Sequence, residues 1–198
     1  KYKYTVKVYF FGRMTSIEEI VNYDDLSLDE INDLIDEALA FKNGKVVDYQ
    51  QKESRLQNRF FEPSTRTHYS FDMAAGNLGC RTQKFLKQAI QAKKSETLYD
   101  TCKLFESIGC DALVIRHSDD DYYKQLTALN VPILNAGDGK GNHPSQSLLD
   151  LMTIKEEFGI FEGLKVVIGG YLHSRVAHSN YNVMQRLGMS VYTSGPLE

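Results

Sequence analysis

The chain has 198 residues, which fits one large domain or two small ones. Hydrophobic residues make up 42% and charged residues 25%, close to a globular average, which excludes disorder, collagen and a disulfide scaffold. The net charge of −3 excludes a general nucleic-acid binder, because neutralising phosphates requires a basic surface. The three cysteines, Cys80, Cys102 and Cys110, lack C-x-x-C spacing and predict reduced thiols in a cytoplasmic protein, with no metal site.

The first thirteen residues, KYKYTVKVYFFGR, differ in composition from the rest of the chain. Apolar and polar side chains alternate there, which predicts a strand. We expect residues 1–13 to be an N-terminal extension, native or introduced for expression, with Met14 as a candidate native start. The longest apolar run, near residues 166–172, is too short to span a membrane, which takes about 20 residues, and no signal peptide is visible.

A helix is predicted after Ser27, because Ser27 and Glu30 form a capping-box sequence and apolar residues follow at helical spacing until Gly44. From Leu56 onward, strand-like and helix-like segments alternate. Further helices are predicted at 67–78, 96–108, 122–129, 146–158 and 176–187. Buried parallel strands are predicted at 112–115, 131–134 and 166–168, with a last strand near 189–193. The alternation predicts an α/β fold with parallel sheets in three αβα layers.

We expect two domains along this alternation. Residues 14–149 are expected to form the first, and the helix at 146–158 to cross to the second, which residues 150–198 begin. That second part has only about two strands and two helices, too few to bury a good core alone. We therefore expect the second domain to be incomplete in this chain.

Hydroxyl and guanidinium groups lie where an apolar strand ends and a helix begins, at Ser64, Thr65, Arg66 and Thr67. A helix N-terminus offers free N–H groups and the positive end of the helix dipole, which suit a phosphate. Arg66 adds a planar fork of donors. The alternative, which the spacing alone favours, is an ordinary N-cap with a surface arginine.

Two more segments place polar groups after predicted strands. Arg116 follows the strand at 112–115, although the segment alone favours a surface salt-bridging arginine. In NAGDGKGNHPSQ, small and turn-forming residues precede His143, a donor for a carbonyl oxygen, and Gln146, a partner for an amide. A solvated loop histidine is the alternative. Because ligands in such folds bind beyond the carboxyl ends of the strands, the three segments together predict an anion site that polarises a carbonyl.

Several blocks, in order, resemble the catalytic chains of the aspartate carbamoyltransferase family, bacterial form. They are FFEPSTRTHYSF, SETLYDT, DALVIRH, VPILNAGDG, HPSQSLLDLMTI and SRVAHSN, and the resemblance runs from about residue 14 to residue 196. STRT alone is shared with ornithine carbamoyltransferases and indicates only the superfamily. Glu62-Pro63, NAGDG and LLDLMTI indicate the aspartate branch.

The resemblance implies transfer of the carbamoyl group of carbamoyl phosphate to the amino group of L-aspartate, an early step of pyrimidine synthesis. It implies no metal or other cofactor and no covalent intermediate. It further implies a homotrimer with active sites shared between chains, and it leaves open a higher assembly with a regulatory chain. No nucleic-acid or membrane partner is expected.

The family's motifs also assign roles to individual residues. Those matched to carbamoyl phosphate are Ser64, Thr65, Arg66, Thr67, Arg116, His143 and Gln146. Arg116 and His143 are expected to polarise the carbonyl. Lys94 matches a lysine lent by the neighbouring subunit, which also contacts aspartate, and Arg175 matches a residue that holds the aspartate carboxylate. The expected catalytic residues are Arg66, Arg116, His143 and Lys94.

Four features differ from the family pattern. Ile90 stands where the family has a phosphate-contacting serine, and Ser95 replaces a glycine. In the turn before SRV, Tyr171 takes the place of an aspartate, with about one residue fewer. The chain also covers about two thirds of the family's length. Two alternatives therefore stay open: a non-catalytic homologue or fragment that keeps a phosphate-binding, trimer-forming domain, and a carbamoyltransferase for another amine such as ornithine.

Overall fold

The computed structural model describes residues 22–24, 26–45, 55–84, 96–171 and 173–196. The strand predicted at 1–13 and the positions Ile90, Lys94 and Ser95 lie outside the described residues. Five α-helices are described: α1 (Leu28–Lys42), α2 (Thr65–Asn77), α3 (Leu98–Ser107), α4 (Pro144–Phe158) and α5 (Arg175–Arg186). The described strands are β1 (Arg55–Phe60), β2 (Arg81–Lys84), β3 (Ala112–His117), β4 (Ile133–Asp138), β5 (Lys165–Gly169) and β6 (Ser190–Ser194).

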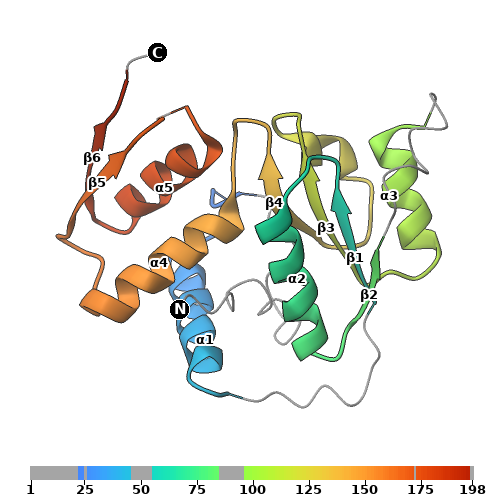
Figure 1. Ribbon diagram of the computed structural model, residues 1–198, viewed down its shortest axis with the longest axis horizontal. Helices are drawn as coiled ribbons and strands as arrows, with labels where there is room; N and C mark the ends of the chain where they lie inside the picture. Colours follow the sequence, from blue (N-terminus) through green and yellow to red (C-terminus); the bar gives the residue numbers. More distant parts are fainter. Residues whose placement is uncertain (1–21, 25, 46–54, 85–95, 172, 197–198) are drawn as a thin grey trace.

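The strands form two parallel sheets, which confirms the predicted α/β class. The larger sheet has the order β2-β1-β3-β4, and the smaller one pairs β5 with β6. Figure 1 shows α4 running from the larger sheet toward the β5–β6 unit, with α1 beside it. The helix predicted to cross between the two parts of the chain is therefore α4, which begins two residues earlier than predicted because Pro144 occupies the first turn.

The central strand β3 is buried on both faces of the larger sheet, as expected for a parallel sheet covered by helices. Ala112 and Val114 of β3 belong to a core shared with α1, α2, α4 and α5. Leu113 and Ile115, which point the opposite way, pack in a second core with Phe105 of α3. These two cores are the physical basis of the three αβα layers.

The predicted start and end of α1 are confirmed. The Ser27 hydroxyl accepts a hydrogen bond from the Glu30 N–H at 3.2 Å, and the Glu30 carboxylate accepts one from the Ser27 N–H at 2.8 Å. This capping box satisfies two N–H groups that the helix leaves without partners. At the other end, Gly44 has a φ of +98°, a backbone conformation that favours glycine.

Two sequence predictions of local structure were wrong. The segment predicted as a helix at 122–129 is the short 3-10 helix η3 (Tyr122–Leu126), in which the Tyr122 hydroxyl donates to the Ile115 carbonyl oxygen at 2.9 Å. The strand at 166–168 was predicted to be buried, but Val167 is 66% exposed. Only one face of the β5–β6 sheet packs on the core, through Val166 and Val191, so residues on the other face remain exposed among the described residues.

Candidate active site

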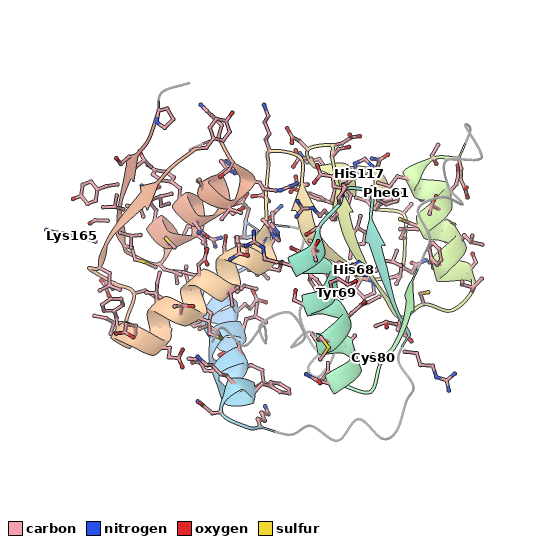
Figure 2. The ribbon with its side chains drawn as sticks, viewed as in Figure 1. Phe61, His68, Tyr69, Cys80, His117 and Lys165 are labelled. Atoms are coloured by element: carbon pink, nitrogen blue, oxygen red, sulfur yellow. The ribbon has the colours of Figure 1, made fainter. Side chains whose placement is uncertain are left out.

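The carboxyl ends of β1, β3 and β4 meet at one edge of the larger sheet, where α2 and α4 also begin. Figure 2 shows Phe61 and His117 together at this edge, and their ring centroids lie 5.1 Å apart. The Phe61 N–H donates to the Arg116 carbonyl oxygen at 2.9 Å, so pairing between the two segments continues past the end of β1. The predicted site residues of the larger sheet therefore share one edge.

The pairing of β3 with β4 is irregular at this edge. The β3–β4 register shifts between Ile115 and His117, so that β4 accommodates one extra residue near Gly137, as in a β-bulge. Gly137 has a φ of +118°, and its N–H donates to the Asn135 side-chain oxygen at 2.8 Å. The missing side chain at Gly137 leaves backbone surface that other groups approach closely.

Three predicted site residues converge on Gly137. A Cβ atom placed there would lie 3.2 Å from Arg116 Nη1, 3.3 Å from Arg175 Nε and 3.3 Å from His143 Cδ2. These side chains come from the end of β3, the first residue of α5 and the N-cap of α4. The structure thus brings together two guanidinium groups and an imidazole, which are all hydrogen-bond donors for an anion or a carbonyl oxygen.

Glu62 joins the two arginines at this site. Its Oε2 atom accepts a hydrogen bond from Arg175 Nη2 at 2.7 Å and lies 3.2 Å from Arg116 Nε, an ion pair without hydrogen-bond geometry. Arg175 Nη1 is buried and has no hydrogen-bond partner among the described residues. One carboxylate therefore faces two guanidinium groups, and donor capacity for a further anion remains.

The pKa of Arg116 reflects both its burial and this excess of guanidinium groups over carboxylates. Burial, and next the positive charge of Arg175, lower the pKa of Arg116, while Glu62 raises it in part. A guanidinium stays protonated despite such a shift, so the lowered pKa means that the cationic form is under-stabilised. An anion bound beside Arg116 supplies the missing negative charge.

His143 is only 4% exposed, so it is not a solvated loop histidine. Its Nδ1 atom lies 3.3 Å from the Ser145 hydroxyl oxygen, and its backbone N–H donates to the Ser179 hydroxyl at 2.8 Å. When Ser145 donates to Nδ1, Nε2 carries the ring proton. Because Cδ2 is bonded to Nε2 and faces Gly137, this proton is on the edge of the ring that borders the site.

The N-terminus of α2 differs from an ordinary cap. Ser64 occupies the N-cap position, but its side chain makes no capping hydrogen bond. Thr65 and Arg66 follow in the first turn and are exposed, while Thr67 is buried. The Ser64 hydroxyl therefore does not cap α2, and the predicted phosphate residues lie at the helix end whose N–H groups suit an anion.

Gln146 lies in the first turn of α4 and has a fixed side chain. Its Nε2 atom donates to Asp150 Oδ1 at 3.1 Å, and Asn180 Nδ2 of α5 donates to Asp150 Oδ2 at 2.7 Å. Burial raises the pKa of Asp150, and these two amide hydrogen bonds lower it in part. This network was not predicted from the sequence.

The loop that carries His143 is organised by Asp138, which is fully buried. Its Oδ1 atom accepts hydrogen bonds from the Asn142 N–H at 2.7 Å and the Asn135 side-chain amide at 2.9 Å. Its Oδ2 atom accepts one from the Asp121 N–H at 2.9 Å. Asp138 thus supplies the acceptors that the turn-forming NAGDGKGN segment needs, which explains why an aspartate stands among its glycines.

Helix α5 also supports this loop. His178 Nδ1 lies 2.9 Å from the Gly141 carbonyl oxygen, and Ser179 accepts the hydrogen bond from the His143 N–H. Arg175, His178, Ser179 and Asn180 all belong to the SRVAHSN block. That block is therefore the part of α5 that contacts the rest of the site.

Sequence reasoning had not assigned site roles to Glu62, Asp150 or Ser179. Each acts through a partner distant in the chain or on a neighbouring helix, and the only available signal was a polar residue beside a predicted site residue.

Tyr171 is exposed and its ring lies 5.7 Å from that of His173. Within the described parts of the chain, no group of three or more metal-binding side chains is found, and no helix is long and apolar enough to cross a membrane.

The fold and this site define an α/β protein with a cluster of cationic and imidazole donors at the carboxyl edge of its larger parallel sheet. Residues 18–156 match the family model of the aspartate/ornithine carbamoyltransferase carbamoyl-P binding domain. The chain is 51% identical over 183 residues to the aspartate carbamoyltransferase catalytic subunit of Staphylococcus epidermidis, covering 92% of this chain and 62% of the relative. The chain is also 46% identical to the aspartate carbamoyltransferase catalytic subunit of Listeria welshimeri, covering 92% of this chain and 60% of the relative. The chain belongs to the aspartate/ornithine carbamoyltransferase family.

Solved structures agree with this assignment. Aspartate transcarbamoylase from Trypanosoma cruzi in complex with aspartate and phosphate aligns with a TM-score of 0.78 at 33% identity, covering 89% of this chain and 56% of that chain. The same enzyme in complex with N-(phosphonacetyl)-L-aspartic acid aligns with a TM-score of 0.81 at 28% identity, covering 91% and 70%. The chain spans about three fifths of the length of the curated relatives it matches.

Proposed function

We propose that the chain carries out carbamoyl transfer from carbamoyl phosphate to L-aspartate, yielding N-carbamoyl-L-aspartate and phosphate in pyrimidine synthesis. The observation that carries the proposal is the convergence of Arg116, His143 and Arg175 on Gly137, with Glu62 as the carboxylate partner of the two arginines. The Trypanosoma cruzi structures with carbamoyl phosphate and aspartate, or with carbamoyl aspartate and phosphate, support the same choice of substrates.

The first step needs donors aimed at the carbonyl oxygen of carbamoyl phosphate. The aspartate nitrogen attacks the carbamoyl carbon, and the C=O electron pair moves to oxygen, giving a tetrahedral oxyanion. Arg116 and the Nε2–H of His143 face this oxygen. A preorganised donor of this kind contributes a factor of about 10²–10³ in rate.

The second step breaks the bond between the carbamoyl carbon and the phosphate oxygen. The electron pair of that bond leaves with the phosphate, which takes the proton that the attacking amine loses. Ser64, Thr65, Arg66 and Thr67 bind the departing phosphate, and Arg175 binds the aspartate carboxylate. The phosphate serves as the base, which removes the need for a separate carboxylate or imidazole base at the amine.

The proposed domain boundaries separate the residues that bind phosphate from the part of the chain that binds aspartate. We assign carbamoyl phosphate binding to residues 14–149 and the beginning of the aspartate-binding domain to residues 150–198. The two separate sheets joined by α4 support this division. The exposed side chains of Val167 and Tyr192 on β5 and β6 support a second domain that continues beyond these two strands.

The proposed assembly is a homotrimer in which Lys94 of one subunit completes the site of its neighbour. Tyr69, labelled in Figure 2, and Met73 are 58% and 64% exposed on α2, whose first turn contains the proposed phosphate residues. An exposed apolar surface beside a binding site is typical of an interface. We place the protein in the cytoplasm, where its three cysteine thiols stay reduced.

The test is carbamoyl transfer by the 198-residue chain with aspartate and ornithine in parallel, measured as carbamoyl amino acid formed. We expect product from aspartate only. His143→Ala is expected to lower kcat by about 100-fold while the affinity for phosphate changes far less. Product from ornithine only would overturn the aspartate assignment. No product from either amine would exclude a competent transferase and leave the non-catalytic, phosphate-binding alternative.

A further inference from the structure

We propose that Asp150 is a positioning residue that fixes the orientation of the Gln146 side-chain amide. In this orientation the Gln146 carbonyl oxygen faces the –NH₂ group of the carbamoyl substrate. The proposal rests on the proposed function and extends it to the residue that selects an amide over other acyl groups. It is carried by the contacts between α4 and α5.

An amide side chain has two ends of similar shape and opposite hydrogen-bonding character. A carboxylate accepts hydrogen bonds and donates none, so Asp150 accepts from the –NH₂ end of Gln146 and rejects the oxygen end. The 3.1 Å hydrogen bond from Gln146 Nε2 to Asp150 Oδ1 spans one turn of α4. With Nε2 held there, Gln146 Oε1 is left as the end that accepts from a ligand.

Asn180 fixes the carboxylate in turn. It is 8% exposed, and its Nδ2 atom donates to the second oxygen of Asp150 at 2.7 Å. Asn180 Oδ1 is buried and has no hydrogen-bond partner among the described residues, so the asparagine contributes a donor and leaves its own acceptor unsatisfied. Both oxygens of Asp150 are therefore occupied by amide donors, which restrains the rotation of its carboxylate.

Burying the Asp150 carboxylate has a cost, which its two amide hydrogen bonds offset only in part. Burial raises the pKa of Asp150, which means that its charged form is disfavoured in the folded chain. An asparagine or leucine at this position would remove that cost. A charge kept at a cost, in contact with a residue of the carbamoyl site, indicates a role in binding rather than in folding.

The test compares two ligands that differ only in the group that Gln146 recognises. Phosphonoacetamide carries an amide –NH₂ beside its carbonyl, and 2-oxopropylphosphonate carries a methyl group of similar size. We expect the wild-type chain to bind the amide about 3- to 10-fold more tightly, the value of one hydrogen bond. Calorimetric titration of both ligands gives this ratio for each variant.

Asp150→Asn keeps the size of the side chain but no longer fixes the orientation of the Gln146 amide, because an asparagine can present either its donor or its acceptor end to Gln146. The ratio is expected to fall toward one, while the affinity for 2-oxopropylphosphonate stays unchanged. The double variant Asp150→Asn/Asn180→Asp should restore the ratio. The new carboxylate on α5 accepts from the –NH₂ of the new amide, which leaves its oxygen to accept from Gln146 Nε2.

Glu157→Gln is the matched control, because Glu157 is an exposed acid on the same helix. An unchanged ratio in Asp150→Asn, or no recovery in the double variant, would overturn the role of Asp150 and leave the proposed function intact. Wild-type binding of both ligands with equal affinity would overturn the recognition of the amide alone. Binding of neither ligand would overturn the phosphate site and this inference together.

A second measurement does not depend on ligand binding. The side-chain amide protons of Gln146, followed by nuclear magnetic resonance, are expected to exchange with solvent more slowly in the wild-type chain than in Asp150→Asn. Equal exchange rates would show that the carboxylate does not restrain Gln146.

Discussion

The geometry of the candidate site depends on Gly137, because the side chains of Arg116, Arg175 and His143 surround the place where a Cβ atom would lie. Arg116 and His143 come from β3 and the start of α4, whereas Arg175 comes from α5. A glycine at this position serves both a bulged backbone with positive φ and the close approach of the three donors. Its role is therefore geometric, and it supplies no chemical group.

We expect Gly137→Ala to weaken phosphate binding by at least 10-fold. The new methyl group would lie 3.2–3.3 Å from Arg116, Arg175 and His143 and would displace them, and the positive φ adds strain of about 1–3 kcal/mol. Gly44→Ala is the control, since Gly44 also has a positive φ but has no atom within 4 Å of the added Cβ. It should lower stability and leave phosphate affinity unchanged. Equal losses of affinity in both variants would contradict the crowding argument.

Helices α4 and α5 are joined by the Asp150–Asn180 hydrogen bond, so we expect the ionisation of Asp150 to affect the stability of this contact. Burial raises the pKa of Asp150 in the folded chain above its value in the unfolded chain. A group shifted in this direction contributes stability below its unfolded pKa, and that contribution is lost as the pH rises through its folded pKa.

The free energy of unfolding of the wild-type chain relative to Asp150→Asn should therefore fall as the pH rises from acid toward neutral. Denaturant unfolding at a series of pH values measures this difference, and Glu157→Gln again provides the comparison. If the wild-type chain instead gains stability over Asp150→Asn with rising pH, the hydrogen bonds of Asp150 outweigh its burial and its pKa is lowered by folding.

Local signals predicted some elements well and failed on others for physical reasons. The Ser27–Glu30 capping box and Gly44 located α1, because capping depends on groups within a few residues. The apolar run in β5 predicted a strand but not its exposure, because burial depends on what covers each face. The helix predicted from Tyr122 onward shortened to η3, where side-chain and turn contacts replace a continuing helix.

The same distinction applies to the site. The positions of Arg116, His143 and Gln146 at the ligand-binding edge of this fold class were predictable, because each lies at or just after the end of a strand. The pairing of Glu62 with Arg175 was not, because the two residues are 113 positions apart and meet only when α5 packs beside the larger sheet. The resemblance to the family identified residues, whereas the ion pairs that hold them required the structure.

In the proposed function, one ligand contacts residues from both parts of the molecule. The phosphate residues and Arg116 belong to the larger sheet, while Arg175 leads the helix that packs with β5 and β6. In the proposed reaction a single bound molecule bridges these parts. Binding should thus stabilise both, by about 2.7 kcal/mol when the ligand is at 100 times its Kd.

We expect N-(phosphonacetyl)-L-aspartic acid, which combines a phosphonate with an aspartate end, to slow hydrogen exchange in both parts of the chain. Protection should include residues 175–180 at the start of α5 as well as 61–67 and 133–146, because Arg175 exchanges the carboxylate of Glu62 for that of the ligand. Phosphate alone, which lacks the aspartate end, is the control and should protect the larger sheet more than α5. Protection by the bisubstrate ligand confined to the larger sheet would show that Arg175 does not bind the aspartate end. The site would then be a phosphate site of the first domain, with aspartate bound by residues elsewhere.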